Sequence, residues 1–206
     1  HAANMIVVRY SDSHGGVENL TIDGAGLANV YGLAVVPENR YQTSNLVFQL
    51  YNHFSNLYVE SCAEGLVLQS GPRVNGADSG CWYNEFSCMH IFSCRRGIWL
   101  VAPPNLGSGV NRNWFVDVRI GQACNTGVQI DSGGTNNFQI ALEGVETGTS
   151  PNATPTALQI AAADKFGTAN ESNRFWGVTF EGNTRDIDNA SPYTELHGCL
   201  YSGAKI

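Results

Sequence analysis

Charged residues, and lysine above all, are scarce in this chain. Only 14% of its 206 residues are charged, the net charge is −7, and the two lysines are Lys165 and Lys205. An average soluble domain carries about 25% charged residues. An acidic chain with so few basic residues cannot form the basic surface that binds nucleic acid, so we expect no nucleic-acid partner. The hydrophobic share of 43% is nevertheless enough to bury a core, so we expect a folded domain.

Long apolar runs and metal-type cysteine pairs are also missing. No stretch approaches about 18 consecutive apolar residues, so we expect no membrane insertion. The six cysteines include no C-x-x-C pair, so we expect neither a zinc ribbon nor another metal, and no cofactor. Three cysteines instead share the pattern C-x-x-G-apolar, at Cys62, Cys94 and Cys124. Such recurrence indicates one structural position used several times.

The chain contains an internal repeat of about 30 residues. One mark of it is a Gly-apolar-x-apolar segment, found at Gly32, Gly65, Gly97 and Gly127, with a fifth copy at Ala157 and a weaker sixth at Asp186-Ile187. The other mark is an Asn-x-Phe segment, whose members are Asn52 and Phe54, Asn84 and Phe86, Asn113 and Phe115, Asn136 and Phe138, and Asn173 and Phe175. We expect the repeated glycines to allow a positive φ at the next bend.

Between the two marks, apolar and polar residues alternate with a period of two. His90, for example, lies between Met89 and Ile91, and Arg119 lies between Val118 and Ile120. This alternation predicts strands of about three to five residues with one buried face. Short strands that recur with this period, without a leucine-rich consensus, predict an all-β parallel β-helix of about six coils. We assign residues 1–188 to it and residues 189–206 to a cap or the start of a following segment.

Equivalent residues of successive coils lie above one another in such a stack. We therefore expect an inward column of stacked phenylalanine rings, and an inward cysteine column that fills a narrow corner. The asparagines can hydrogen-bond to one another along the stack where the backbone turns. For all of these residues a structural role is favoured over a redox or metal-binding one.

These patterns, together with Leu142-Glu143-Gly144 and Phe180-Glu181-Gly182-Asn183, resemble one known class. It is the single-stranded right-handed β-helix of the pectate-lyase-like class, most similar in pattern to phage tailspikes, tail fibres and related viral adhesins. The resemblance covers about residues 15–187. It implies a right-handed coil, a side-by-side homotrimer, a virion or other extracellular location, and binding or cleavage of a cell-surface polysaccharide. The catalytic blocks of polygalacturonases and pectate lyases are absent, which disfavours a pectin-degrading enzyme.

Two glutamates are the candidate catalytic residues. If Leu142 and Phe180 are inward neighbours, Glu143 and Glu181 lie one coil apart, and Glu60 shares their column. A retaining glycosidase needs two carboxyl groups about 5 Å apart. The alternative is a structural or merely polar pair held by arginines such as Arg119.

Two outward columns are the candidate ligand-binding residues. They are Tyr58, His90 and Arg119 on one strand position, and Trp99, Gln129 and Gln159 on another. Aromatic rings stack on apolar sugar faces and amides bind hydroxyl groups. The alternative is that these faces pack against the other subunits of a trimer. Trp114 and Trp176 each neighbour an inward phenylalanine, so both should point outward.

The sequence thus leaves three functions open. The first is a viral host-attachment domain, of phage tailspike or tail-fibre type, that recognises a cell-surface polysaccharide. The second is a polysaccharide depolymerase on the same scaffold, either a glycoside hydrolase or a lyase. The third is a trimeric shaft with a purely structural role. A groove with exposed aromatic side chains would separate the first two from the third.

Overall fold

The fold is built of β-strands alone throughout the part of the chain that the structure describes. The computed structural model describes residues 5–11, 13–36, 47–70, 79–101, 109–122, 124–131, 134–145, 155–161 and 172–202. Within these ranges no helix has the length and hydrophobicity needed to cross a membrane. The all-β part of the prediction is confirmed.

Sheet A is a seven-stranded parallel sheet in which each strand pairs with the next copy of the repeat. Its strands, in order across the sheet, are β1 (Met5–Tyr10), β3 (Val30–Val35), β6 (Glu64–Gln69), β9 (Arg96–Val101), β11 (Thr126–Ile130), β13 (Thr156–Ile160) and β16 (Ile187–Asn189). The Gly-apolar-x-apolar segments come into register here, since Leu66 pairs with Leu33 on one side and Ile98 on the other.

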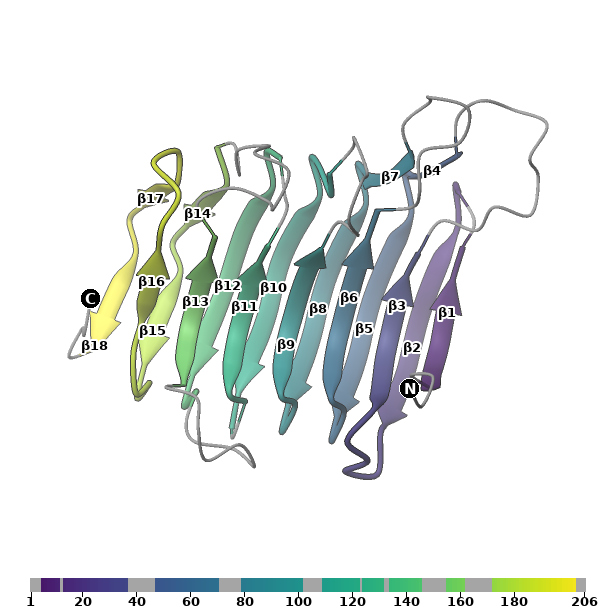
Figure 1. The fold of residues 1–206 in the computed structure, drawn as a ribbon, viewed down its shortest axis with the longest axis horizontal. Helices are drawn as coiled ribbons and strands as arrows, with labels where there is room; N and C mark the ends of the chain where they lie inside the picture. The colour runs from purple at the N-terminus through teal and green to yellow at the C-terminus, as the bar shows by residue number, and fades with distance from the viewer. Residues whose placement is uncertain are drawn as a thin grey trace.

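Sheet B is a nine-stranded parallel sheet that faces sheet A (Figure 1). Its strands are β2 (Gly16–Asp23), β5 (His53–Glu60), β8 (Glu85–Phe92), β10 (Trp114–Gly121), β12 (Asn137–Glu143), β14 (Arg174–Trp176), β15 (Thr179–Glu181), β17 (Glu195–His197) and β18 (Leu200–Ser202). A third, two-stranded parallel sheet consists of β4 (Val47–Leu50) and β7 (Ser79–Trp82). Strands β17 and β18 lie in the stretch where the sequence repeat fades, and they extend sheet B.

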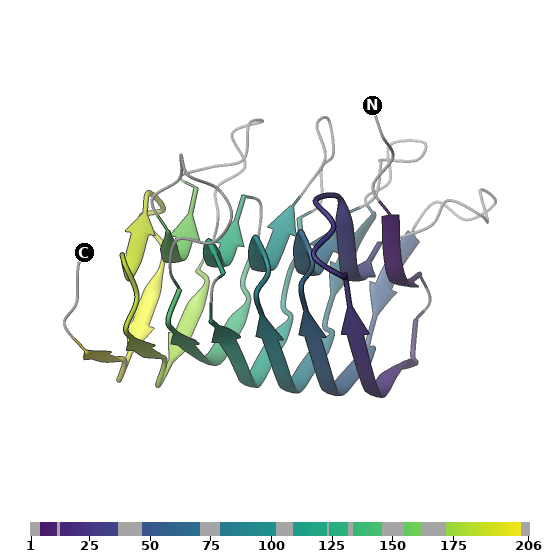
Figure 2. The same ribbon diagram turned by 90° about the horizontal axis from the view of Figure 1, so that it is seen from below.

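Along the chain, strands of sheet A alternate with strands of sheet B. In both sheets the colour runs from purple to yellow along the long axis, because each strand is added beside the previous one of its sheet (Figure 1). Figure 2 shows the chain turning from one sheet into the other at every repeat. Parallel strands in two facing sheets are consistent with a parallel β-helix.

The phenylalanines of the Asn-x-Phe segments form one stacked column inside the molecule. All five side chains are fully buried. Neighbouring ring centroids lie between 4.6 and 5.0 Å apart, with the planes tilted by 3° to 10°. Parallel strands about 4.8 Å apart place equivalent side chains at this spacing. The column therefore fills the core along the length of the stack.

The five asparagines form a second buried ladder beside the phenylalanines. The side-chain nitrogen of each of the first four donates to the side-chain oxygen of the next asparagine at 2.9 to 3.0 Å. The same oxygen accepts the backbone N–H of the preceding asparagine. Residues that directly precede a ladder asparagine in the chain, such as Tyr51 and Tyr83, have positive φ. The ladder thus supplies partners for backbone groups that a sharp turn has turned away from the sheet.

Cys62, Cys94 and Cys124 form the third buried column. The Cys94 thiol donates to the Phe92 carbonyl oxygen at 3.2 Å, and the other two thiols make equivalent bonds. Hydrogen bonding with the thiols of Cys124 and Cys62, and then burial, raise the pKa of Cys94 above its ordinary value. Cys94 is therefore a packed thiol whose hydrogen bonds are made within the protein.

Replacing Cys94 by serine is expected to lower the free energy of unfolding by about 1–3 kcal/mol, because a buried hydroxyl is costlier than a buried thiol. Cys88→Ser is the matched control, since Cys88 is exposed. A denaturant series that shows equal stability for both variants would mean that the Cys94 corner is accessible to water.

The repeated glycines have a different role from the predicted one. None of Gly32, Gly65, Gly97 and Gly127 has a positive φ. A Cβ atom on Gly65 would instead lie 2.5 Å from Ile91 Cγ2 and 2.8 Å from the Gly97 carbonyl oxygen. The glycines are needed because the corner is narrow. The positive φ values fall on other residues just before the cysteine column, including Ser61 and Ser93.

The central strands of sheet B are longer than predicted. Strands β5, β8 and β10 each have 8 residues. In the middle of each, one residue with positive φ bends the strand without ending it: Asn56, Cys88 and Asp117. The Asn-x-Phe half and the alternating half therefore belong to one bent strand.

Candidate functional site

The outer face of sheet B carries three exposed aromatic side chains. Trp114 is 53% exposed, Trp176 45% and Tyr58 38%. Both tryptophans point away from the core, as expected from their place beside an inward phenylalanine. Exposed apolar side chains that gather on one face, rather than lying singly over the surface, mark interaction sites. This face is therefore the candidate site.

The structure brings Tyr58, His90 and Arg119 together on this face. They occupy neighbouring register positions on β5, β8 and β10. The rings of Tyr58 and His90 are stacked, with centroids 6.3 Å apart. Arg119 reaches along the face to Glu143, with its Nη2 3.1 Å from a carboxylate oxygen.

Three adjoining grooves run across the outer face of sheet B. The first, about 360 Å³, is lined by Tyr58 and His90 together with residues of β2. The second, about 550 Å³, also has His90 in its wall and extends to Arg119 and Gln139. The third, about 310 Å³, also includes Gln139 and lies between Trp114 and Trp176. Shared residues link the grooves into one path across strands β2 to β14.

The two candidate catalytic glutamates lie side by side on sheet B. Glu143 and Glu181 are paired in register on β12 and β15, which puts their Cα atoms about 4.8 Å apart. Glu143 is engaged by Arg119, whereas the Glu181 side chain makes no hydrogen bond or ion pair with any other residue in the described ranges. Neither glutamate lines the three grooves.

The second predicted ligand column lies on sheet A, away from these grooves. Trp99 Nε1 donates to Asp131 at 2.8 Å, and the Arg96 guanidinium lies 3.6 Å from the Trp99 ring centroid. Gln129 accepts a bond from Arg96 and donates one to Asp131. Trp99 and Gln129 thus use their polar atoms within the protein. Gln159 continues the column in register and is half-buried.

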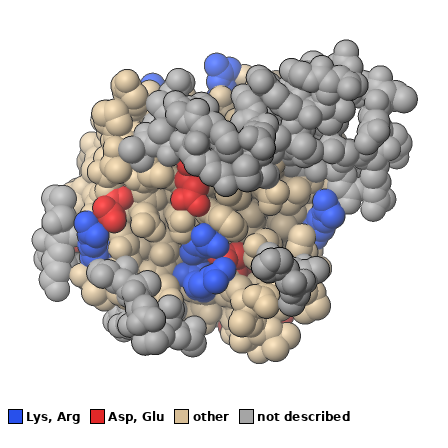
Figure 3. Space-filling view, in the orientation of Figure 1, with Lys and Arg blue, Asp and Glu red and all other residues tan. Residues whose placement is uncertain are grey.

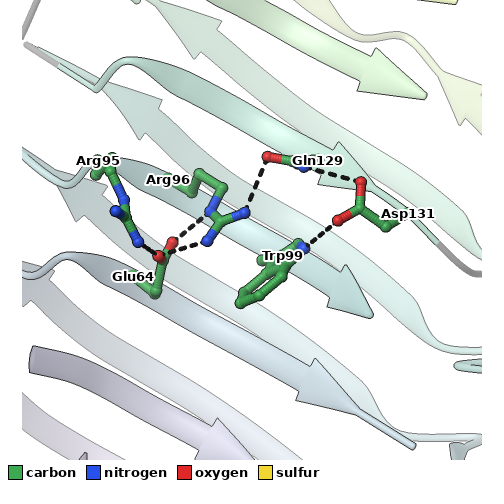
Figure 4. Close-up of polar contacts among 6 residues, drawn as sticks. All are labelled: Glu64, Arg95, Arg96, Trp99, Gln129 and Asp131. Carbon is green, nitrogen blue, oxygen red and sulfur yellow. Dashed lines mark hydrogen bonds and ion pairs between the residues drawn. The ribbon is translucent and has the colours of Figure 1, made fainter. Parts of the chain in front are cut away.

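A buried carboxylate anchors this part of sheet A. Glu64 has no exposed side-chain surface and binds both Arg95 and Arg96 (Figure 4). The Arg96 Nε and Nη2 atoms lie 2.5 and 2.6 Å from its two oxygens. Partial burial, with a contribution from the Glu64 charge, raises the pKa of neighbouring Tyr31. Charged groups are otherwise few on this face, where blue and red surfaces lie close together (Figure 3).

Several residues of the third groove and of the Glu64 ion pair were not predicted from the sequence. Asn137, Gln139 and Arg174 line the third groove, and each flanks a phenylalanine of the repeat. Taking both neighbours of every inward phenylalanine as outward would have found them. Glu64 and Arg96 each directly precede a repeated glycine, so their opposite charges at one repeat position were also a readable signal.

Among the described residues, no group of three or more histidine, cysteine, aspartate or glutamate side chains is placed to hold a metal ion. Comparison with protein-family models, with curated proteins and with solved structures gives no match to this chain.

Proposed function

We propose that the outer face of sheet B binds a cell-surface polysaccharide, and that the chain is a host-attachment domain of a virion. The observation that carries the carbohydrate part is the path of three linked grooves with Trp114, Trp176 and Tyr58 exposed along it. Sugars present apolar ring faces and hydroxyl groups, which such aromatic and amide side chains bind. The resemblance of the repeat to tailspikes and tail fibres supports the viral part.

We further propose that the chain forms a right-handed parallel β-helix of about six coils and assembles side by side as a homotrimer, as the resemblance implies. Light scattering of the purified chain should then give a particle of three chains, each of 22.2 kDa. A monomer at all concentrations would remove the trimer from the proposal while leaving the grooves in place.

Binding is tested with a panel of purified bacterial and algal surface polysaccharides. We expect the protein to be retained by at least one of them in an affinity gel, without release of new reducing ends. Retention by none would favour the shaft, a purely structural role. New reducing ends would make the chain a depolymerase, and ultraviolet absorbance of unsaturated products would make it a lyase.

The depolymerase is kept as a second candidate because Glu143 and Glu181 are register neighbours. If it holds, Glu181→Gln should abolish the release of reducing ends while leaving polysaccharide retention intact. The matched control is Glu60→Gln, which changes the same outward column at the opposite end of sheet B. Equal release by both variants and the unchanged protein would remove Glu181 from catalysis.

A further inference from the structure

The third groove is a grid of six outward side chains on three neighbouring strands. Register pairing puts Trp114, Asn137 and Arg174 in one row across β10, β12 and β14. Val116 and Gln139 are also paired in register, and Trp176 lies two residues beyond Arg174 on β14. The two indoles therefore stand at opposite corners, with the two amides between them.

The two central amides have no partner within the described chain. The side chains of Asn137 and Gln139 make no hydrogen bond to any other residue in the ranges that the structure describes. Gln139 is exposed and Asn137 is half-exposed. The ladder asparagines one position away are, by contrast, bonded to one another. Two open amides between two exposed indoles are an arrangement that stability of the stack does not require.

The grid has the dimensions of a small ring. Two strand spacings separate β10 from β14, about 10 Å, and the two rows are about 7 Å apart. The Cα atoms of Trp114 and Trp176, at opposite corners, are therefore about 12 Å apart, which leaves room for one ring between van der Waals contacts of about 3.5–4 Å on each side. The groove volume of about 310 Å³ is at the small end of ligand pockets.

The grid also carries no unbalanced charge. Its one ionic side chain, Arg174, donates from Nε to Glu195 at 3.2 Å. A hydrogen bond with His197, and then the charge of Arg174, lower the pKa of Glu195, so this carboxylate stays ionised. His197 itself stacks on Trp176 at 4.1 Å, so that the ring is held in place. A negatively charged ligand would meet Glu195 and lose by repulsion what it gained at Arg174.

We propose that this grid binds one neutral pyranose residue, a hexose or an N-acetylhexosamine, which lies over Asn137 and Gln139 against the two indoles. The inference rests on the proposed function and specifies the sugar class and its place. The sugar ring contacts Trp114 on one side and Trp176 on the other, and its hydroxyl or acetamido groups bond to the amides. A uronic acid residue is disfavoured at this position.

Fluorine NMR of protein carrying 5-fluorotryptophan tests the site directly, because the chain has only 4 tryptophans. Single Trp→Phe variants assign the four signals. The probes are cello-, laminari- and chito-hexaoses and an oligogalacturonate, with calorimetry as the separate measure of binding. We expect a neutral hexaose to shift the Trp114 and Trp176 signals together, and the Trp82 and Trp99 signals to stay in place.

Variants give the second arm of the test. Trp114→Ala and Trp176→Ala should each weaken binding of the neutral hexaose by about tenfold or more, with unchanged melting, because both rings are exposed. Tyr193→Ala, also exposed at 54%, is the matched control and should bind normally.

The possible results separate the two proposals. Sugar binding that leaves both groove tryptophans unshifted, or that favours the oligogalacturonate, overturns the pyranose site and leaves glycan recognition standing. Shifts that follow protein concentration in the absence of sugar make the grid a contact between copies of this chain and overturn it too. Absence of binding to every hexaose and to the polysaccharide panel overturns both.

Discussion

Replacing Glu64 by glutamine is expected to lower the free energy of unfolding by about 3–5 kcal/mol. The carboxylate is fully buried and is shared by two guanidinium groups, of which Arg96 is only 16% exposed. The amide has no charge, so Arg96 would keep its positive charge in a site from which water is largely excluded. Equilibrium denaturation with urea measures the loss.

Two controls separate the charge from the packing at this site. Arg95→Gln should cost far less, since half of that side chain is in solvent. A double variant, Glu64→Leu with Arg96→Met, should recover much of the stability, because a well-packed apolar pair can replace a buried ion pair. If Glu64→Gln alone costs less than about 1 kcal/mol, the carboxylate is not held in the buried ion pair described here.

The second large effect is expected at Phe115, in the middle of the ring column. Phe115→Ala should lower the free energy of unfolding by about 3–5 kcal/mol, since it leaves a cavity between two flat neighbours. Phe86 and Phe138 lie 5.0 and 4.6 Å from it, centroid to centroid, and neither can move without leaving its own partner. Thermal and urea unfolding both report the change.

The same column offers its own control. Leu196 pairs in register with Phe175 at the last strand of the column and is 41% exposed. Leu196→Ala should therefore cost under about 1 kcal/mol. If Phe115→Ala and Leu196→Ala lower the free energy of unfolding by similar amounts, the phenylalanine column is not the main source of core stability.

Much of the architecture was readable because each coil repeats the same physical problem. Each phenylalanine follows its asparagine by two residues, although successive copies are 23 to 37 residues apart, and parallel pairing places equivalent residues of neighbouring strands side by side. The place of Trp114 and Trp176 on the surface followed from the same alternation. Side-chain order along sheet B was thus accessible without coordinates.

What could not be read depends on backbone angles and on contacts between coils. The sequence suggested that Gly65 bends the chain, whereas the bend falls on Ser61 and the glycine makes room for Ile91. Nothing in a local pattern shows that a strand continues through a positive φ at Cys88. Likewise, Trp99 gave no sign that Asp131 accepts its indole N–H, because that contact crosses between coils.

The phenylalanine and asparagine ladders affect how the strands select their correct neighbours during folding. If a coil were skipped during folding, each Phe–Phe and Asn–Asn contact would be replaced by another of the same kind, so the ladders tolerate the error. Glu64 does not tolerate it, because within the described ranges its ion pairs are with Arg95 and Arg96, at the start of β9. A misthreaded coil would bury a bare carboxylate at a cost of several kcal/mol. The uniform columns thus stabilise the stack, and the ion pair of Glu64, which breaks the uniformity, selects β9 as the neighbour of β6.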